Sequence, residues 1–207
     1  MKNGIIDVGG GLRGIYGAGV LDRCLEEGIH FDCCIGVSAG SANMSSYIAG
    51  QHGRNKPFYD EYSFRKEYMS VKNLVQKHSY LDLGYVYGTL SNRGGENPLE
   101  KALEMGCDRV AVILTKPVTA ERNNKRDERL SRLICRRYPE AAKGLTQRAR
   151  RYNDAVHKAL AMEQEGKACV IAPDSTEGMS TLTKDKESLE KMYEKGRRDA
   201  EKLLQWY

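Results

Sequence analysis

The stretch FDCCIGVSAGSANM, residues 31–44, places a Gly-x-Ser-x-Gly motif directly after a short apolar run. An apolar strand that ends in a glycine-flanked serine and leads into a helix is the context of a nucleophile elbow. Gly36 and Gly40 let the backbone turn tightly, and the following helix N-terminus favours developing negative charge. We therefore expect Ser38 to be a nucleophile. The alternative is an ordinary serine between small residues.

A second glycine motif, GGGLRG at residues 9–14, closes the apolar segment GIIDV (4–8). Consecutive glycines expose backbone N–H groups that no side chain blocks, and such a nest at a helix N-terminus suits an anion. The spacing also satisfies the G-x-G-x-x-G pattern of dinucleotide loops. Against that interpretation, the acidic residue expected after the second strand is absent and Ser38 stands there instead. A plain tight turn is the remaining alternative.

The rest of the chain alternates between apolar runs and helical patterns. Further strands are expected at 30–37, 109–115 and 168–174, and helices at 13–28, 38–50, 97–106, 138–166 and 185–207, with a break near Gly144. This alternation predicts an α/β fold with a mainly parallel sheet flanked by helices. A length of 207 residues suits one core, so we expect a single domain over 1–207.

The net charge of +5 is unevenly distributed, because Arg and Lys gather in residues 121–158. One interpretation is a solvated helical face. The other is a peripheral contact with an anionic membrane surface such as phospholipid headgroups. Nucleic acid is disfavoured, since no recognition motif accompanies the charge. No apolar run approaches the roughly 20 residues that a membrane span needs.

The six cysteines show no paired spacing of a zinc site. We expect reduced, buried thiols in a cytoplasmic protein, and neither a metal nor a cofactor. The N-terminal residues turn glycine-rich before the apolar core of a signal peptide could form.

Taken together, the two motifs resemble those of the patatin-like phospholipase family, in its bacterial branch. Its oxyanion-loop motif is matched by Gly9, Gly10, Gly11, Arg13 and Gly14, and its elbow motif by Gly36, Ser38 and Gly40. The similarity continues through YMSVKNLV, SYLDLGYVYGTL, PLEKALEMGCDRVAVILTKP and MYEKGRRDA, and so covers most of the chain. It implies a three-layer α/β/α domain that hydrolyses phospholipid or other lipid esters. Ser38 would attack the acyl carbonyl while the loop's N–H groups hold the oxyanion. For Arg13, a surface arginine at a helix start is the alternative role.

The chain departs from the family at the catalytic base. The resemblance implies a Ser–Asp dyad with its aspartate in Asp-Gly-Gly or Asp-Gly-Ala, and neither tripeptide occurs here. The resemblance implies that a family segment is deleted near 92–97 and that the domain is shortened, and Arg93 precedes the Gly94-Gly95 pair. Glu96 is the nearest substitute base, with a surface helix-capping role as its alternative. Asp7 and Asp174 are weaker candidates. The histidines show no triad spacing, and the family uses none.

Two functional interpretations therefore stand. The first is a serine acyl-ester hydrolase, impaired by the loss of the aspartate. The second is a catalytically silent, shortened member that binds lipid or a partner. We expect no carboxylate within hydrogen-bond distance of the Ser38 hydroxyl. Because the deletion uncovers part of the sheet, we also expect either a rearranged loop near Ser38 or a homo-oligomer.

Overall fold

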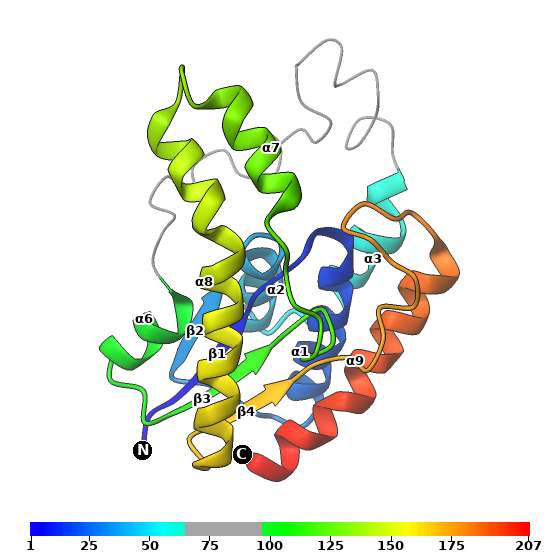
Figure 1. Cartoon of the computed structure of the whole chain (residues 1–207). Coiled ribbons are helices and arrows are strands. Elements are labelled where there is room, and N and C mark those ends of the chain that lie inside the picture. Colours follow the sequence, from blue (N-terminus) through cyan, green and yellow to red (C-terminus); the bar gives the residue numbers. More distant parts are fainter. Residues whose placement is uncertain (65–96) are drawn as a thin grey trace.

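The computed structural model describes residues 1–64 and 97–207, and in this part four parallel strands form one sheet (Figure 1). The order is β2-β1-β3-β4, so the chain leaves β1 for one neighbour and later returns on its other side. The strands are β1 (Asn3–Asp7), β2 (Cys33–Gly36), β3 (Arg109–Ile113) and β4 (Ala168–Ile171). The predicted α/β class is confirmed, with strands shorter than the apolar runs suggested.

Helices connect and cover these strands, and several begin at the residues that the sequence predicts. The Asn97 side chain accepts a hydrogen bond from the Leu99 N–H at 3.0 Å, which caps the helix that Pro98 begins. Asp185 caps the last helix in the same way through Ser188. The helices are α1 (Ile15–Glu26), α2 (Ala39–Ile48), α3 (Asn55–Asp60), α6 (Pro98–Glu104), α7 (Lys125–Ile134), α8 (Pro139–Gln164) and α9 (Lys186–Trp206), with 3-10 turns η1 (Gly11–Gly14) and η2 (Tyr62–Phe64).

The sheet lies between two helical layers. On one face, α1, α2 and α9 pack over alternate strand residues such as Ile5 and Ile113. On the other face, α6 and α8 cover the intervening residues, including Ile6 and Val112. The side chains of a strand alternate between faces, so the two apolar clusters together account for the nearly continuous apolar strands. The three-layer α/β/α arrangement is as the resemblance implies.

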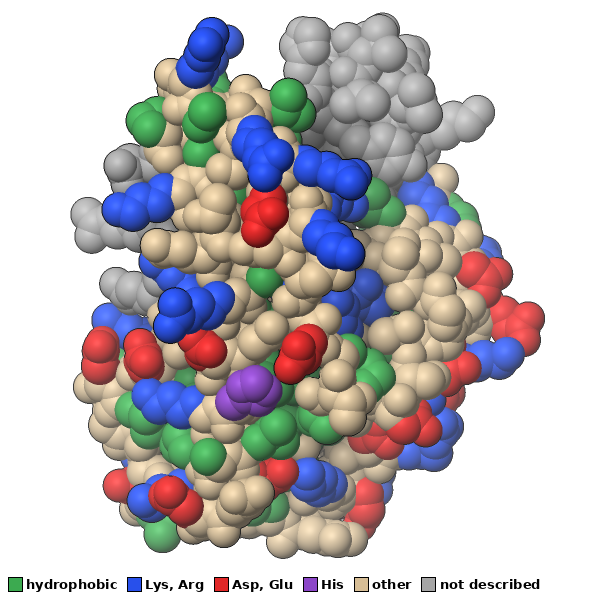
Figure 2. All heavy atoms as spheres, viewed as in Figure 1, with side chains coloured by type: hydrophobic (Ala, Val, Ile, Leu, Met, Phe, Trp, Pro, Cys, Tyr) green, Lys and Arg blue, Asp and Glu red, His purple; other side chains and the backbone are tan. Residues whose placement is uncertain are grey.

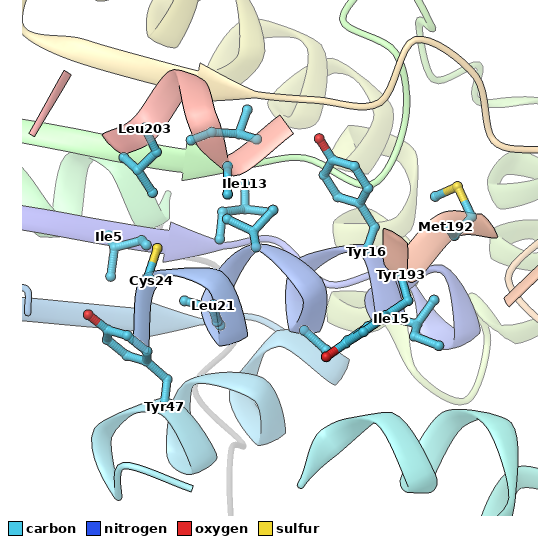
Figure 3. Packing of buried hydrophobic residues seen from close by; sticks show 14 of the residues in the cluster. Ile5, Ile15, Tyr16, Leu21, Cys24, Tyr47, Ile113, Met192, Tyr193 and Leu203 are labelled. Atoms are coloured by element: carbon cyan, nitrogen blue, oxygen red, sulfur yellow. The ribbon is translucent and has the colours of Figure 1, made fainter. Parts of the chain in front are cut away.

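Helices α1 and α9 approach so closely that their backbones touch. A Cβ atom on Gly19 would lie 2.3 Å from the Tyr193 carbonyl oxygen, and one on Gly196 would lie 2.1 Å from that of Tyr16. Figure 3 shows the side chains of Tyr16 and Tyr193 packed at this contact. Glycine at both positions is what lets these two helices meet, although they are far apart in the sequence.

Two expectations about the helices and cysteines need correction. Helix α8 runs without a break through Gly144, because a single glycine costs only about 1 kcal/mol in a long helix that is anchored on the sheet. Cys135 is exposed, whereas the other thiols are buried or partly buried, and all six are free. The segments YMSVKNLV and SYLDLGYVYGTL, and nearly all of the region near 92–97, lie outside the described residues.

Candidate active site

Ser38 lies in the tight turn between β2 and α2, with φ 55° and ψ −125°. Besides Ser38, Glu177 is the other non-glycine residue with positive φ in the described part of the chain. Such a conformation costs about 1–3 kcal/mol and persists where the surroundings enforce it. The side chain makes no capping hydrogen bond to α2 and is exposed. The predicted strained strand-to-helix turn is therefore present, and its hydroxyl makes no hydrogen bond to another described residue.

The flanking glycines are required by close packing of the turn. A Cβ atom on Gly36 would lie 2.5 Å from the Gly40 carbonyl oxygen, and one on Gly40 would lie 2.3 Å from that of Asp7. The Ser41 hydroxyl fixes the turn by donating to the Gly36 carbonyl oxygen at 2.9 Å. The motif thus serves a backbone geometry that larger residues would prevent.

The triple-glycine loop after β1 lies directly against this elbow. All three glycines have positive φ, and a Cβ atom on Gly9 would lie 3.0 Å from the backbone nitrogen of Ala39. The Gly9 N–H donates to Asp7 Oδ1 at 2.8 Å and is thus already engaged. The N–H groups of Gly10 and Gly11 make no hydrogen bond within residues 1–64 and 97–207. These two are the loop donors available to an oxyanion.

Asp7 is the last residue of β1, and its side chain links the glycine loop to α2 by hydrogen bonds. It is fully buried, and its Oδ2 accepts from the Asn43 side chain at 2.8 Å. Burial raises its pKa from 3.8 to about 6, although the hydrogen bonds from Asn43 and Gly9 oppose the rise. Asn43 also donates to the Gly14 carbonyl oxygen at 2.9 Å and accepts from the Tyr59 hydroxyl. Both Asp7 oxygens are therefore occupied by this structural network.

The other carboxylates predicted as a base are not brought to Ser38. Glu96 lies outside the described residues. Asp174 pairs with Lys195 of α9, and this ammonium lowers the pKa of the carboxyl. Among the described residues, no hydrogen bond joins the Ser38 hydroxyl to a carboxylate. The general base therefore stays a prediction.

A cavity of about 1180 Å³ opens beside Ser38, at the carboxyl ends of the strands. Ligands of open α/β sheets bind at this edge, where the strand order reverses. Its walls come from the glycine loop, α6, the segment after β3, α7 and α8. The loop is fixed there by Thr115, whose hydroxyl donates to the Gly9 carbonyl oxygen at 2.6 Å. Within the described residues, no group of His, Cys, Asp or Glu is arranged to hold a metal ion.

Several site residues were missed by sequence reasoning. Asn43 is the only amide in the small-residue helix after the elbow, and this polar position in a buried stretch was a usable signal. Thr115 and Lys116 had no local signal, because the pairing of β3 with β1 brings them to the cavity wall.

Comparison with known proteins decides the family. The model of the family described as "Patatin-like phospholipase" matches residues 8–161, which is most of the chain. The chain belongs to the patatin-like phospholipase family.

The patatin-like chain also matches, over residues 138–206, a domain of unknown function, DUF6363. It is 34% identical over 79 residues to the uncharacterized protein YjjU of Escherichia coli (strain K12). That alignment covers 38% of this chain and 22% of YjjU. No solved structure matches this patatin-like chain. None of the helices described in it has the length and apolar character to cross a membrane.

Proposed function

We propose that this patatin-like chain is a serine acyl-ester hydrolase of phospholipid or other lipid esters. The observation that carries the proposal is the strained Ser38 turn, packed against a loop whose Gly10 and Gly11 N–H groups make no hydrogen bond to a described residue. Donors fixed in advance around a developing oxyanion supply a large part of catalysis in acyl transfer. The adjoining cavity has room for a lipid ester.

In the proposed reaction, Ser38 Oγ bonds to the acyl carbonyl carbon and its proton passes to a general base. Negative charge develops on the carbonyl oxygen, where the Gly10 and Gly11 N–H groups stabilise it. The ester C–O bond then breaks, and the leaving alcohol takes the proton. Water next attacks the acyl-enzyme, which releases the fatty acid and restores Ser38. Glu96 is the proposed base, since it is the carboxylate nearest in sequence to the family's aspartate position.

The second candidate is a catalytically silent member that keeps the fold and binds lipid or a partner. It is favoured by the free Ser38 hydroxyl, which no carboxylate engages within the described residues. A serine hydroxyl is a weak nucleophile without a base, and loss of one member of a catalytic unit costs roughly 10⁴–10⁶ in rate.

A fluorophosphonate probe separates the two candidates. The hydrolase predicts labelling of the wild type, loss of labelling in Ser38→Ala, and undiminished labelling in the matched control Ser45→Ala on the exposed side of α2. Turnover of a short-chain ester should follow the same pattern and fall in Glu96→Gln. A folded wild type that neither labels nor turns over the ester would establish the silent member instead.

We also propose that residues 121–158 contact an anionic membrane surface in the cytoplasm. This region carries twelve Lys and Arg against five Asp and Glu. Leu133 of α7 is 81% exposed, and Leu130 is exposed beside it. Figure 2 shows Lys and Arg side chains with hydrophobic side chains between them over this end of the molecule. Apolar side chains among cations favour binding at a lipid interface.

We further propose that the protein self-associates, because the shortening of the domain should uncover part of the sheet. Sedimentation velocity at several protein concentrations tests it: a dimer is the expected result, and a single monomeric species would refute it.

A further inference from the structure

The segment that joins β4 to α9, residues 172–185, lies against the triple-glycine loop. The Leu12 N–H donates to the Thr181 carbonyl oxygen at 2.9 Å, although the two residues stand at opposite ends of the chain. Thr181 and Leu182 also line the cavity beside Ser38. The segment therefore reaches the same site as the glycine loop and the elbow.

Thr181 packs directly on one of the two donors that the proposed reaction uses. A Cβ atom on Gly11 would lie 2.4 Å from both Thr181 Cγ2 and the Thr181 carbonyl oxygen. Gly11 also has a φ of 62°, so glycine is required there for space and for backbone conformation. The next N–H along the loop, that of Leu12, is the one that Thr181 accepts. Thr181 thus restrains the loop at the point where its free donors end.

The segment is itself anchored just before Thr181. The Met179 side chain is buried in the apolar cluster beneath α1 and α9. The Glu177 carboxylate accepts a hydrogen bond at 2.6 Å from Lys195, which belongs to α9. Glu177 also has a φ of 49°, a conformation that persists only where the surroundings enforce it. These anchors hold the Thr181 carbonyl at a defined place beside the glycine loop.

We propose that Thr181 is a positioning residue, which fixes the Gly10 and Gly11 N–H groups in the orientation that an oxyanion needs. The inference rests on the proposed hydrolase function. It gives a role to part of residues 138–206, which the domain of unknown function matches. Thr181 acts through the loop and not on the reacting atoms. Oxyanion donors must lie about 3 Å from the developing charge, and a misplacement of about 1 Å can cost about 10²-fold in rate.

Steady-state kinetics with a short-chain ester test the positioning role. Thr181→Gly removes the methyl contact with Gly11 and frees the backbone at 181 to leave the Leu12 N–H. Its kcat should fall about 10–100-fold with KM within about twofold of wild type, since the donors act on the developing oxyanion. Thr181→Val keeps the methyl and the carbonyl, loses only the long 3.5 Å hydrogen bond from Arg13, and should restore kcat to within about threefold of wild type. The matched control Thr119→Gly, exposed and not among the cavity-lining residues, should leave both constants unchanged.

Amide hydrogen exchange on the folded proteins separates this inference from the proposed function. The Leu12 N–H should exchange about tenfold faster in Thr181→Gly than in wild type, as loss of one hydrogen bond predicts. The Val8 N–H, which donates to the Ile113 carbonyl oxygen, should exchange alike in both.

The outcomes are distinct for the two proposals. A folded wild type that neither labels with fluorophosphonate nor turns over the ester refutes the hydrolase, whereas faster exchange at Leu12 in Thr181→Gly would leave the anchoring of the loop standing. Equal exchange at Leu12 in both proteins overturns the inference. In an active enzyme it is also overturned by an unchanged kcat in Thr181→Gly, by an equal fall in Thr181→Val, or by a rise in KM alone, which would indicate direct contact with the substrate.

Discussion

Replacing Asp7 with asparagine tests the network beneath the elbow through the pH dependence of stability. In the unfolded chain this carboxyl loses its proton near pH 3.8, whereas in the folded protein its pKa is about 6. Between these values the folded state binds more protons, so the free energy of unfolding falls as pH rises. At about 1.4 kcal/mol per pKa unit, the full loss above pH 6 is on the order of 3 kcal/mol.

The Asp7→Asn variant removes this titration, but it also lowers the free energy of unfolding by an amount that does not depend on pH. Asp7 accepts from two donors, the Gly9 N–H and the Asn43 amide. An asparagine offers one acceptor oxygen, so its own amide must face one of these donors. That mismatch costs about 1–3 kcal/mol at every pH. Wild type should therefore be the more stable protein at pH 4.5, and its advantage should shrink by about 2 kcal/mol by pH 7.5.

Urea unfolding followed by circular dichroism from pH 4.5 to 7.5 measures this difference. Asp174→Asn is the control, since Asp174 is exposed and Lys195 lowers its pKa. Its small effect should have the opposite sign, with wild type gaining stability relative to the variant as pH rises. An offset between wild type and Asp7→Asn that stays constant over this range would refute the reasoning, because the carboxyl would then titrate alike in both states.

Three further outcomes follow from the contacts described. Gly19→Ala should lower the free energy of unfolding by about 1–3 kcal/mol, because its methyl group would overpack the contact with α9. Gly144→Ala faces open space in α8 and should raise the free energy of unfolding by up to about 1 kcal/mol. Thermal unfolding of both variants measures these changes. Asn43→Ala should slow fluorophosphonate labelling at Ser38, checked by labelling time courses on folded protein. Leu133→Ser should weaken flotation with phosphatidylserine vesicles several-fold, whereas Ile48→Ser, at an exposed position on α2, should not; equal losses would contradict the proposed membrane contact.

Local signals in the sequence were sufficient for the elements that carry the site. The turn at Ser38 could be predicted because its glycines and small residues specify one backbone path over a few positions. The helix start at Asn97 could be predicted for the same reason. The break predicted at Gly144 was wrong, since the packing of the whole of α8 outweighs one residue's preference.

Long-range features of the site could not be predicted in this way. The hydroxyl of Thr115 bonds to Gly9, 106 positions away, and Lys116 follows it into the cavity wall because β3 pairs with β1. Nothing within a short window of sequence encodes which strand lies beside β1. Asn43 is an intermediate case. The sequence shows a single amide in a helix of small residues, but it does not show that this amide bonds to Asp7 and Gly14.

The glycine contact between α1 and α9 also has a kinetic consequence. Tyr16 donates to Asp199 at 2.7 Å and Tyr193 donates to Asp22 at 2.8 Å, so the bonds across this interface span 183 and 171 positions. Contacts between residues this far apart in sequence form only after the chain has closed a very long loop, and the entropic cost of that closure slows folding. Helix α1 continues directly from the triple-glycine loop. In refolding, the surroundings of Ser38 should therefore form late, at the rate at which these two distant helices come into contact.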